Sequence, residues 1–299
     1  MPAALVRPAW LDTAVWPHHV GTLWLGDRRV AYTDVGTGRP LLFLNAPQWS
    51  MVWRDVIARL QPRYRCVTLD APGLGLSDRL EADRQHLGTV RDATVALVDH
   101  LQLRETTLVV HDLGGLAGLA AVAARPAAFD RLVAINTFGW RPEGVLLPVM
   151  LSIFGSGLLR RLDAATRALP VATSGPLGVG RAIVRPSRAA FRRAFDRAAT
   201  AAMHRMFADA ASNAEIHRQA AAGLAVLAPR PALTVFGAWG DYLRFRRAWR
   251  RRLLVLTEVT VPHGLHFPMT DDPTMVADAI AAWDAATAGA PGVINPLRM

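Results

Sequence analysis

The stretch "TLVVHDLGGLAGLA", residues 107–120, carries one acidic side chain between an apolar segment and a glycine-rich segment. Residues 107–112 have the β-branched, apolar character of a buried strand, and residues 114–125 have the composition of a helix. Asp112 is therefore expected at a sharp turn between a strand and a helix. One interpretation is that Asp112 caps the helix N-terminus, where aspartate is favoured. The other is that the turn projects a reactive carboxylate above the edge of a sheet.

The segments on either side of this stretch alternate between strand-like and helix-like patterns. Short apolar or alternating runs predict strands at 20–26, 29–36, 40–44, 65–70, 107–112, 131–136, 231–237 and 253–261. Helical periodicity predicts helices at 50–61, 89–102, 114–125, 242–252 and 273–288. Because strands that alternate with helices form a parallel sheet covered on both faces, the chain is predicted to be an α/β protein.

The alternation is interrupted once, after the sixth predicted strand. Residues 140–222 are rich in Ala and Arg, have helical periodicity and contain no convincing strand. We interpret this segment as a helical cap domain, inserted between the two parts of a core domain, 1–139 and 223–299. Such a cap would cover the carboxyl ends of the strands, the edge at which open α/β sheets place their sites.

A strand, a sharp turn and a helix together form the nucleophile elbow of α/β-hydrolases, in which the turn residue is usually serine. Here the turn residue is Asp112, and Gly114 and Gly115 allow the helix to approach the strand closely. A carboxylate is ionised near pH 7 and needs no base to activate it. Attack on a saturated carbon would give a stable alkyl ester, which a base-activated water must then hydrolyse. The sequence thus predicts the α/β-hydrolase fold, with a mostly parallel eight-stranded sheet, and displacement at saturated carbon.

The second step requires a histidine base and an acid that orients it. His266, in the late segment 261–273, is the preferred base, and His263 is the alternative. Asp241 follows the predicted strand 231–237 and is the candidate acid, although it could also cap the next helix. The order Asp112, Asp241, His266 is the order of nucleophile, acid and base in this fold.

From about residue 20 to 288 the chain resembles the haloalkane dehalogenases and their relatives, the epoxide hydrolases. The motifs that carry the resemblance are "VVHDLGG" around Asp112, "MVWRDVI" (51–57), "LDAPGLGLSD" (69–78), "AINTFGW" (134–140) and "GLHF…DDP" (264–273). The resemblance implies an aspartyl-ester mechanism without a cofactor. It also implies that the backbone N–H groups of Ala46 and Leu113 form the oxyanion hole. No pair of histidines has metal-ligand spacing together with a third ligand, so we expect no metal.

Two positions depart from the dehalogenase pattern. The family has a tryptophan directly after the nucleophile and usually an asparagine before the proline of the turn after the third strand, and both hold the departing halide. Here these positions are Leu113 and Ala46. Loss of one preorganised donor costs about 3–4 kcal/mol. Asn45, Trp49, Asn136 and Trp140 are the candidate substitutes and the predicted substrate-binding residues.

Other reactions remain open at this stage. Epoxide hydrolases of this kind use two lid tyrosines, whereas the tyrosines of this chain are Tyr32, Tyr64 and Tyr242, outside the predicted cap. Opening of a lactone at a saturated carbon is a further alternative. A protein that keeps the fold but binds its ligand without turnover is the alternative of a different class. The leaving group itself is not predicted.

The composition gives expectations about partners and location. The net charge is +10, and all 34 basic residues are arginine. No zinc spacing or nucleic-acid motif is present, so we expect no nucleic-acid partner; weak attraction to an anionic membrane is preferred to DNA binding. The expected partners are an apolar small-molecule substrate and water, and the sequence predicts no particular oligomeric state. One cysteine, Cys66, and no signal-peptide pattern favour a cytoplasmic protein, with peripheral membrane contact as the alternative.

Overall fold

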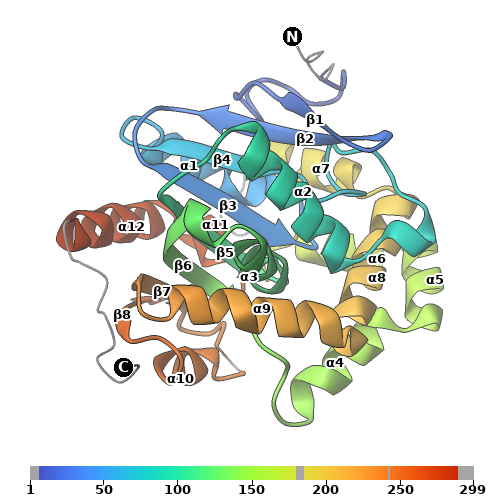
Figure 1. Cartoon of the computed structure of the whole chain (residues 1–299). Coiled ribbons are helices and arrows are strands. Elements are labelled where there is room, and N and C mark those ends of the chain that lie inside the picture. The colour runs from blue at the N-terminus through green and yellow to red at the C-terminus, as the bar shows by residue number, and fades with distance from the viewer. Residues whose placement is uncertain (1–6, 180–184, 242, 289–299) are drawn as a thin grey trace.

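The computed structural model describes residues 7–179, 185–241 and 243–288, and its centre is an eight-stranded sheet (Figure 1). The strand order is β1-β2-β4-β3-β5-β6-β7-β8, and all neighbours are parallel except where β2 pairs with β1 and β4. The predicted α/β-hydrolase fold is confirmed. The strands are β1 Gly21–Leu25, β2 Arg28–Val35, β3 Pro40–Ala46, β4 Arg65–Leu69, β5 Thr106–Asp112, β6 Phe129–Thr137, β7 Pro231–Gly237 and β8 Val255–Val261.

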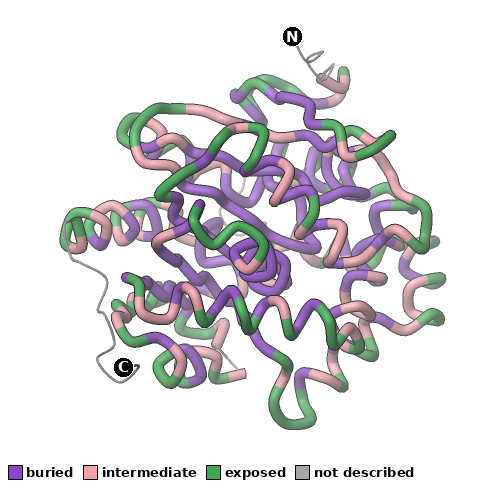
Figure 2. Tube along the Cα trace, viewed as in Figure 1, coloured by how far each residue is buried: buried purple, intermediate pink, exposed green. Residues whose placement is uncertain are grey.

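Two groups of helices flank the sheet. In the first group α3 packs between α2 and α9, and in the second α1 packs against α12. The central strands β3, β5, β6 and β7 are buried along nearly their whole length, as expected for strands covered on both faces (Figure 2). The helices of the two groups are α1 Arg54–Leu60, α2 Leu87–His100, α3 Gly114–Ala124, α9 Ala214–Leu227 and α12 Pro273–Thr287.

The segment after β6 is helical, as predicted. Its helices are α4 Leu146–Gly155, α5 Gly157–Thr166, α6 Ala168–Thr173, α7 Arg185–Ala194 and α8 Arg197–Ser212. The predicted cap boundary at residue 222 falls inside α9, which packs against α3 of the core, and residues 180–184 of the cap range lie outside the described residues. The division into two domains stays a prediction. None of the described helices is both long and apolar enough to cross a bilayer.

Near the C-terminus the elements are shorter than predicted. The expected helix 242–252 is reduced to α10, Phe245–Arg250, because Arg244 takes the left-handed conformation at its start and Arg251 follows its last turn. Tyr242 lies outside the described residues. The four-residue helix α11, Pro268–Asp271, was not predicted and lies directly before α12.

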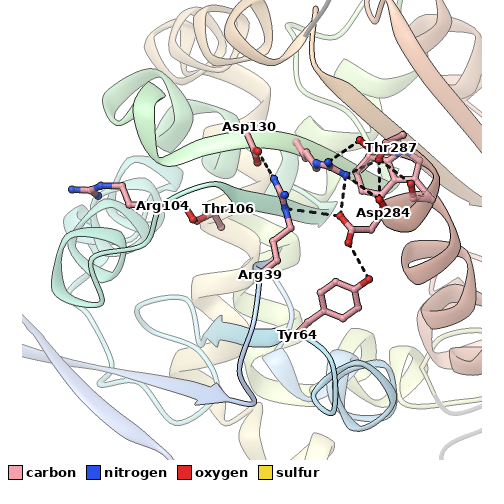
Figure 3. A network of polar contacts seen from close by, with 9 residues as sticks. Arg39, Tyr64, Arg104, Thr106, Asp130, Asp284 and Thr287 are labelled. Atoms are coloured by element: carbon pink, nitrogen blue, oxygen red, sulfur yellow. Dashed lines mark hydrogen bonds and ion pairs between the residues drawn. The ribbon is translucent and has the colours of Figure 1, made fainter. Parts of the chain in front are cut away.

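A network of polar contacts ties α12 to the end of the sheet opposite Asp112 (Figure 3). Arg131, at the start of β6, binds the Asp284 carboxylate at 2.9 Å and the Thr287 hydroxyl at 2.6 Å. The Tyr64 hydroxyl donates to Asp284 at 3.1 Å. Because the Arg131 side chain is only 6% exposed, its charge requires this partner, and the network fixes the last helix on the sheet.

Two glycines allow α3 to approach the sheet closely. A Cβ added at Gly114 would lie 2.5 Å from the Leu44 carbonyl oxygen, on β3. A Cβ added at Gly115 would lie 2.2 Å from the Phe138 carbonyl oxygen, just after β6. Both obstacles are backbone atoms, so a side chain at either position would force the helix away from the sheet.

We therefore expect Gly115→Ala to lower the free energy of unfolding by at least about 2 kcal/mol, since the helix must move to accommodate one methyl group. Gly157→Ala is the matched control, because a Cβ there would lie 3.7 Å from its nearest neighbour, the flexible Arg160 side chain. Denaturant unfolding of both variants measures the difference. Equal stability of the two variants would contradict the close approach.

Candidate active site

Asp112 lies at the tip of the elbow between β5 and α3. Its φ of 51° is in the left-handed region, which turns the side chain out of the strand. Its backbone carbonyl accepts a hydrogen bond of 2.6 Å from the Thr137 hydroxyl on the neighbouring strand β6. The N-cap residue of α3 is Leu113, with no side-chain cap. The helix-cap interpretation of Asp112 is therefore wrong, and the carboxylate is available for another role.

The structure brings Asp112 and His266 together. His266 Nε2 lies 3.2 Å from Asp112 Oδ2, and the two side chains are 33% and 15% exposed. The alternative base, His263, is exposed and does not line the cavity that contains Asp112. Of the two candidate histidines, His266 is the one that lines the cavity together with Asp112.

The backbone carbonyl of His266 is held from two sides. Asn136 Nδ2 donates to this oxygen at 3.0 Å and to the Leu265 carbonyl at 2.7 Å. His111 Nε2 lies 2.9 Å from the same His266 oxygen. Asn136 has a φ of 37° and is skipped in the β5–β6 register, so this bulge directs its amide towards the loop of His266.

The sequence did not predict a role for His111. The side chain is fully buried on β5, in ring contact with His266 at 4.9 Å and Phe267 at 5.0 Å between centroids. Burial, and secondarily the nearby His266, lowers the pKa of His111 to about 3. The ring is neutral at neutral pH and donates from Nε2. The only feature of the sequence that could have indicated this role is the position of His111 directly before Asp112.

Asp241 has a different partner from the one predicted. It follows β7, and its carboxylate accepts a hydrogen bond of 2.9 Å from Arg246 Nε and a longer one of 3.4 Å from the Arg246 backbone N–H. Within residues 7–179, 185–241 and 243–288, no hydrogen bond joins Asp241 to His266. These contacts correspond to the helix-holding alternative, and the role of Asp241 as the orienting acid stays a prediction.

One of the two N–H groups predicted to form the oxyanion hole already has a hydrogen-bond partner. The Leu113 N–H donates to the Ala46 carbonyl oxygen at 2.9 Å and continues the pairing of β5 with β3. This amide is therefore engaged within the sheet. Stabilisation of negative charge at Asp112 by Leu113 would require this hydrogen bond to be shared, and the assignment of Ala46 and Leu113 stays a prediction.

Asp112 and His266 open into a largely apolar cavity of ≈ 180 Å³ between the sheet edge and the cap helices. Its polar side chains are Asp112, His266, Asn136, Gln48 and Thr173. Its apolar lining comes mainly from α4, α6, α8 and the segment around α10: Leu113, Phe138, Leu147, Met150, Leu151, Phe154, Leu169, Phe207, Leu243, Phe245 and Phe267. Such a surface favours an apolar ligand with one reactive polar group.

Three of the four predicted substrate-binding residues lie outside this lining. Asn45 is 1% exposed and is held by the Gln48 carbonyl at 2.9 Å and by Trp53 Nε1 at 2.8 Å. Trp49 is buried against Trp10. These residues serve the core, because the turn after β3 directs their side chains inward.

Trp140, the third of these residues, packs against Trp249 with 4.9 Å between ring centroids and carries the Arg252 guanidinium over its ring at 4.3 Å. Gln48, which was not predicted, lines the cavity in place of Asn45. Its position directly after the Ala46–Pro47 turn was the available signal.

The described part of the chain contains no group of three His, Cys, Asp or Glu side chains that could hold a metal ion. Cys66 is buried, and burial raises the pKa of its thiol to about 12. The thiol is thus not a nucleophile at neutral pH. Asp112 is the carboxylate among the described residues that line the cavity.

Comparison with known proteins agrees with the fold. Residues 39–178 match the family model described as the alpha/beta hydrolase fold. A haloalkane dehalogenase structure from Bradyrhizobium elkani superimposes with a TM-score of 0.77, at 20% identity, over 91% of this chain and 99% of that one. The chain has the α/β-hydrolase fold.

Among curated relatives the chain is 28% identical to haloalkane dehalogenase 2 of Mycobacterium bovis, over 84% of this chain and 90% of the relative. It is 34% identical to a cis-3-alkyl-4-alkyloxetan-2-one decarboxylase of Shewanella oneidensis, over 46% of each chain. The protein is thus an enzyme that resembles the haloalkane dehalogenases, as the sequence motifs indicated, and it also has a lactone-decarboxylase relative.

The neutral state of buried His111 predicts a pH-dependent stability. The pKa of 6.5 in the unfolded chain falls to about 3 in the fold, so the unfolded state binds the extra proton between these values. The contribution of His111 to the free energy of unfolding is fully present above pH 6.5. It decreases on acidification, by about 2 kcal/mol at pH 5. We expect His111→Gln to remove this part of the pH dependence.

Denaturant unfolding at pH 7 and pH 5 measures the effect. His19→Gln, at an exposed histidine, is the control and should keep the wild-type slope. An unchanged pH dependence in His111→Gln would show that this imidazole does not remain neutral in the fold.

Proposed function

We propose that this α/β-hydrolase cleaves a bond at a saturated carbon of an apolar substrate through a covalent ester of Asp112, as a haloalkane dehalogenase-like enzyme. The observation that carries the proposal is the 3.2 Å contact between Asp112 Oδ2 and His266 Nε2 in an apolar cavity of ≈ 180 Å³. A cavity of this kind excludes bulk water, which strengthens the carboxylate as a nucleophile.

The first step is a displacement. An Asp112 carboxylate oxygen forms a bond to the substrate carbon, the bond from that carbon to the leaving group breaks, and its electron pair departs with the leaving group. No proton is transferred if the leaving group is a halide. The carboxylate needs no activation, so the cavity has only to orient the carbon and stabilise the departing anion.

The second step is hydrolysis of the ester. His266 Nε2 removes a proton from a water molecule, and the water oxygen attacks the Asp112 carboxyl carbon. The bond between this carbon and the alkyl oxygen breaks, and the alcohol leaves with a proton. One oxygen of Asp112 then comes from water, whereas the alcohol keeps an original Asp112 oxygen.

The fate of this oxygen is the test of the mechanism. In a single turnover in ¹⁸O-labelled water, we expect the label in the Asp112 peptide and not in the alcohol product, read by mass spectrometry. His266→Gln should accumulate the alkyl ester as a mass shift on the same peptide, because the base of the second step is missing. His263→Gln, at an exposed histidine outside the cavity, is the control and should turn over normally.

Label in the product together with an unmodified Asp112 would mean direct attack by water. Thermal-shift binding of alkyl halides, epoxides and lactones without any product or adduct would favour the alternative that the fold is retained for binding alone.

The leaving group needs a donor, and Gln48 is our candidate. The positions that carry halide donors in the dehalogenases are Leu113 and Ala46 here. Asn136 lines the cavity, but its amide is committed to the Leu265 and His266 carbonyls. Gln48 is 5% exposed and lines the same cavity, and within the described residues no hydrogen bond of its side-chain amide is found. Its N–H groups are therefore free to meet a developing anion.

We expect Gln48→Leu to lower kcat by roughly tenfold to a hundredfold, with a smaller effect on KM, because a donor to a developing charge acts mainly in the transition state. Gln48→Glu keeps the size of the side chain and removes its N–H donors, so it should lose at least as much activity. The loss should be larger for chloride than for iodide, the better leaving group. A kcat within about twofold of wild type in Gln48→Leu would exclude this role.

A lactone is the second candidate substrate. The similarity to an oxetanone decarboxylase favours it, and so does the lack of side-chain halide donors at positions 46 and 113. When Asp112 attacks the saturated ring carbon of a lactone, the ring C–O bond breaks and the leaving carboxylate stays attached to the bound substrate. Parallel assays of halide release from alkyl bromides and of ring opening of dialkyl oxetanones distinguish the two substrates. The epoxide alternative is disfavoured, since no tyrosine is found in the described lining of the cavity.

A further inference from the structure

The outer surface of the cap carries most of the exposed large hydrophobic side chains of the described chain. Outside it, only three are found, Trp24, Trp239 and Leu254. The others lie on or beside α4, α5 and α6, and we call them the cap apolar face: Val145, Leu146, Val149, Ile153, Leu158, Leu162, Val171 and Leu177. These three helices lie together on one side of the molecule (Figure 1). A concentration of this kind in one segment marks an interaction site.

The helix α4 is apolar on two sides. Leu146, Val149 and Ile153, spaced three and four residues apart, are 48–65% exposed. Leu147 and Leu151 are buried in the wall of the substrate cavity. The inward-facing residues are explained by the cavity. The outward-facing ones are not explained by any contact within the described chain.

The exposed charges between residues 144 and 178 are all positive. The only acidic residue in this segment is Asp163, which is 3% exposed and bound to His204 at 2.8 Å. Arg160, Arg161 and Arg167 are at least partly exposed and form no ion pair with the described residues. Between residues 144 and 178 the cap apolar face is thus accompanied by cationic side chains, and the nearest exposed carboxylate along the chain, Glu143, is paired with Arg252.

The basic character continues beyond the N-terminus of α4. A surface groove formed by residues 142–147 is bounded on its other side by α10 and contains Arg244, Arg247 and Arg251. Arg244 and Arg247 are exposed and form no ion pair within the described chain, whereas Arg251 lies 3.9 Å from Glu143. Arginines therefore surround the exposed side chains of α4 on more than one side.

We propose that the cap apolar face docks on the surface of an anionic lipid bilayer. Exposed leucines, isoleucine and valines insert at the boundary of the acyl chains, and the arginines bind lipid phosphates. Arginine suits this position, because its apolar stem can lie along the hydrocarbon while the guanidinium reaches the headgroups. A second copy of the chain fits less well, since a two-fold contact through this face would bring arginines against arginines.

Docking would also place the cap next to the source of an apolar substrate. This statement about the substrate rests on the proposed function, whereas the proposal that the face docks on a bilayer does not. The helices α4 and α6 separate the docked surface from the cavity, because each contributes residues to both. A substrate dissolved in the bilayer could therefore enter without crossing bulk water.

Co-sedimentation of the whole chain with vesicles tests the docking. We expect binding to phosphatidylcholine vesicles that contain phosphatidylglycerol, weaker binding to phosphatidylcholine alone, and weaker binding in high salt. The triple variant Leu146→Ser, Ile153→Ser, Leu158→Ser should lose binding by more than about tenfold. Its control replaces three exposed hydrophobic residues elsewhere: Trp24→Ser, Trp239→Ser, Leu254→Ser.

The charge contribution has its own matched pair of variants. Arg160→Gln, Arg161→Gln, Arg167→Gln should weaken binding by about a hundredfold, at roughly 1 kcal/mol for each arginine near the surface. Arg63→Gln, Arg104→Gln, Arg230→Gln removes the same charge from exposed positions outside the cap and should change binding little. Thermal unfolding of all four variants verifies their folding, and turnover of a water-soluble substrate shows that the site is intact.

Three results would overturn the proposal. These are an absence of binding to anionic vesicles in low salt, equal losses in the cap variants and their controls, and a dimer in solution that the leucine substitutions dissociate. The last result would assign the cap apolar face to a second copy. Vesicle binding without any turnover would leave the docking in place and count against the proposed function alone.

Discussion

The structure depends on a carboxylate that is held above the sheet edge by a left-handed turn. Asp112 can adopt its φ of 51° because α3 packs close enough to the sheet to fix the turn, and this packing requires Gly114 and Gly115. His266 lies on a different segment, so the pair forms only if a second loop is fixed equally well. The hydrogen bonds from Asn136 and His111 to the His266 carbonyl provide this. The 3.2 Å contact between Asp112 and His266 therefore depends on several segments at the edge of the sheet and not on one motif.

The sequence was sufficient for the fold and for the central pair, for a physical reason. Parallel strands covered on both faces are continuous apolar runs, and this pattern is visible without any knowledge of contacts. Asp112 and His266 could be predicted because each follows a strand at the same sheet edge, where the fold places its site. The helix-cap interpretation of Asp112 failed because the turn fixes the carboxylate away from the first N–H groups of α3.

The supporting residues could not be predicted, because their roles depend on contacts far along the chain. His111 acts on a carbonyl 155 residues away, and Asn136 acts on one 130 residues away. Gln48 takes the place expected for Asn45, since the turn after β3 directs Asn45 to Trp53 and leaves Gln48 at the cavity. A local pattern shows that a turn is present but not which of its side chains faces a cavity.

The cap shows how one segment can meet two requirements. An apolar cavity needs apolar residues on the inner sides of α4 and α6. It places no such requirement on the residues of their outer sides. Yet the outer sides also carry large hydrophobic residues, and Asp163, the one acidic residue between residues 144 and 178, is buried with His204. An ordinary solvated helix surface mixes charges of both signs. The combination of exposed apolar residues with arginines in excess is instead the one expected of a surface that contacts hydrocarbon and phosphate.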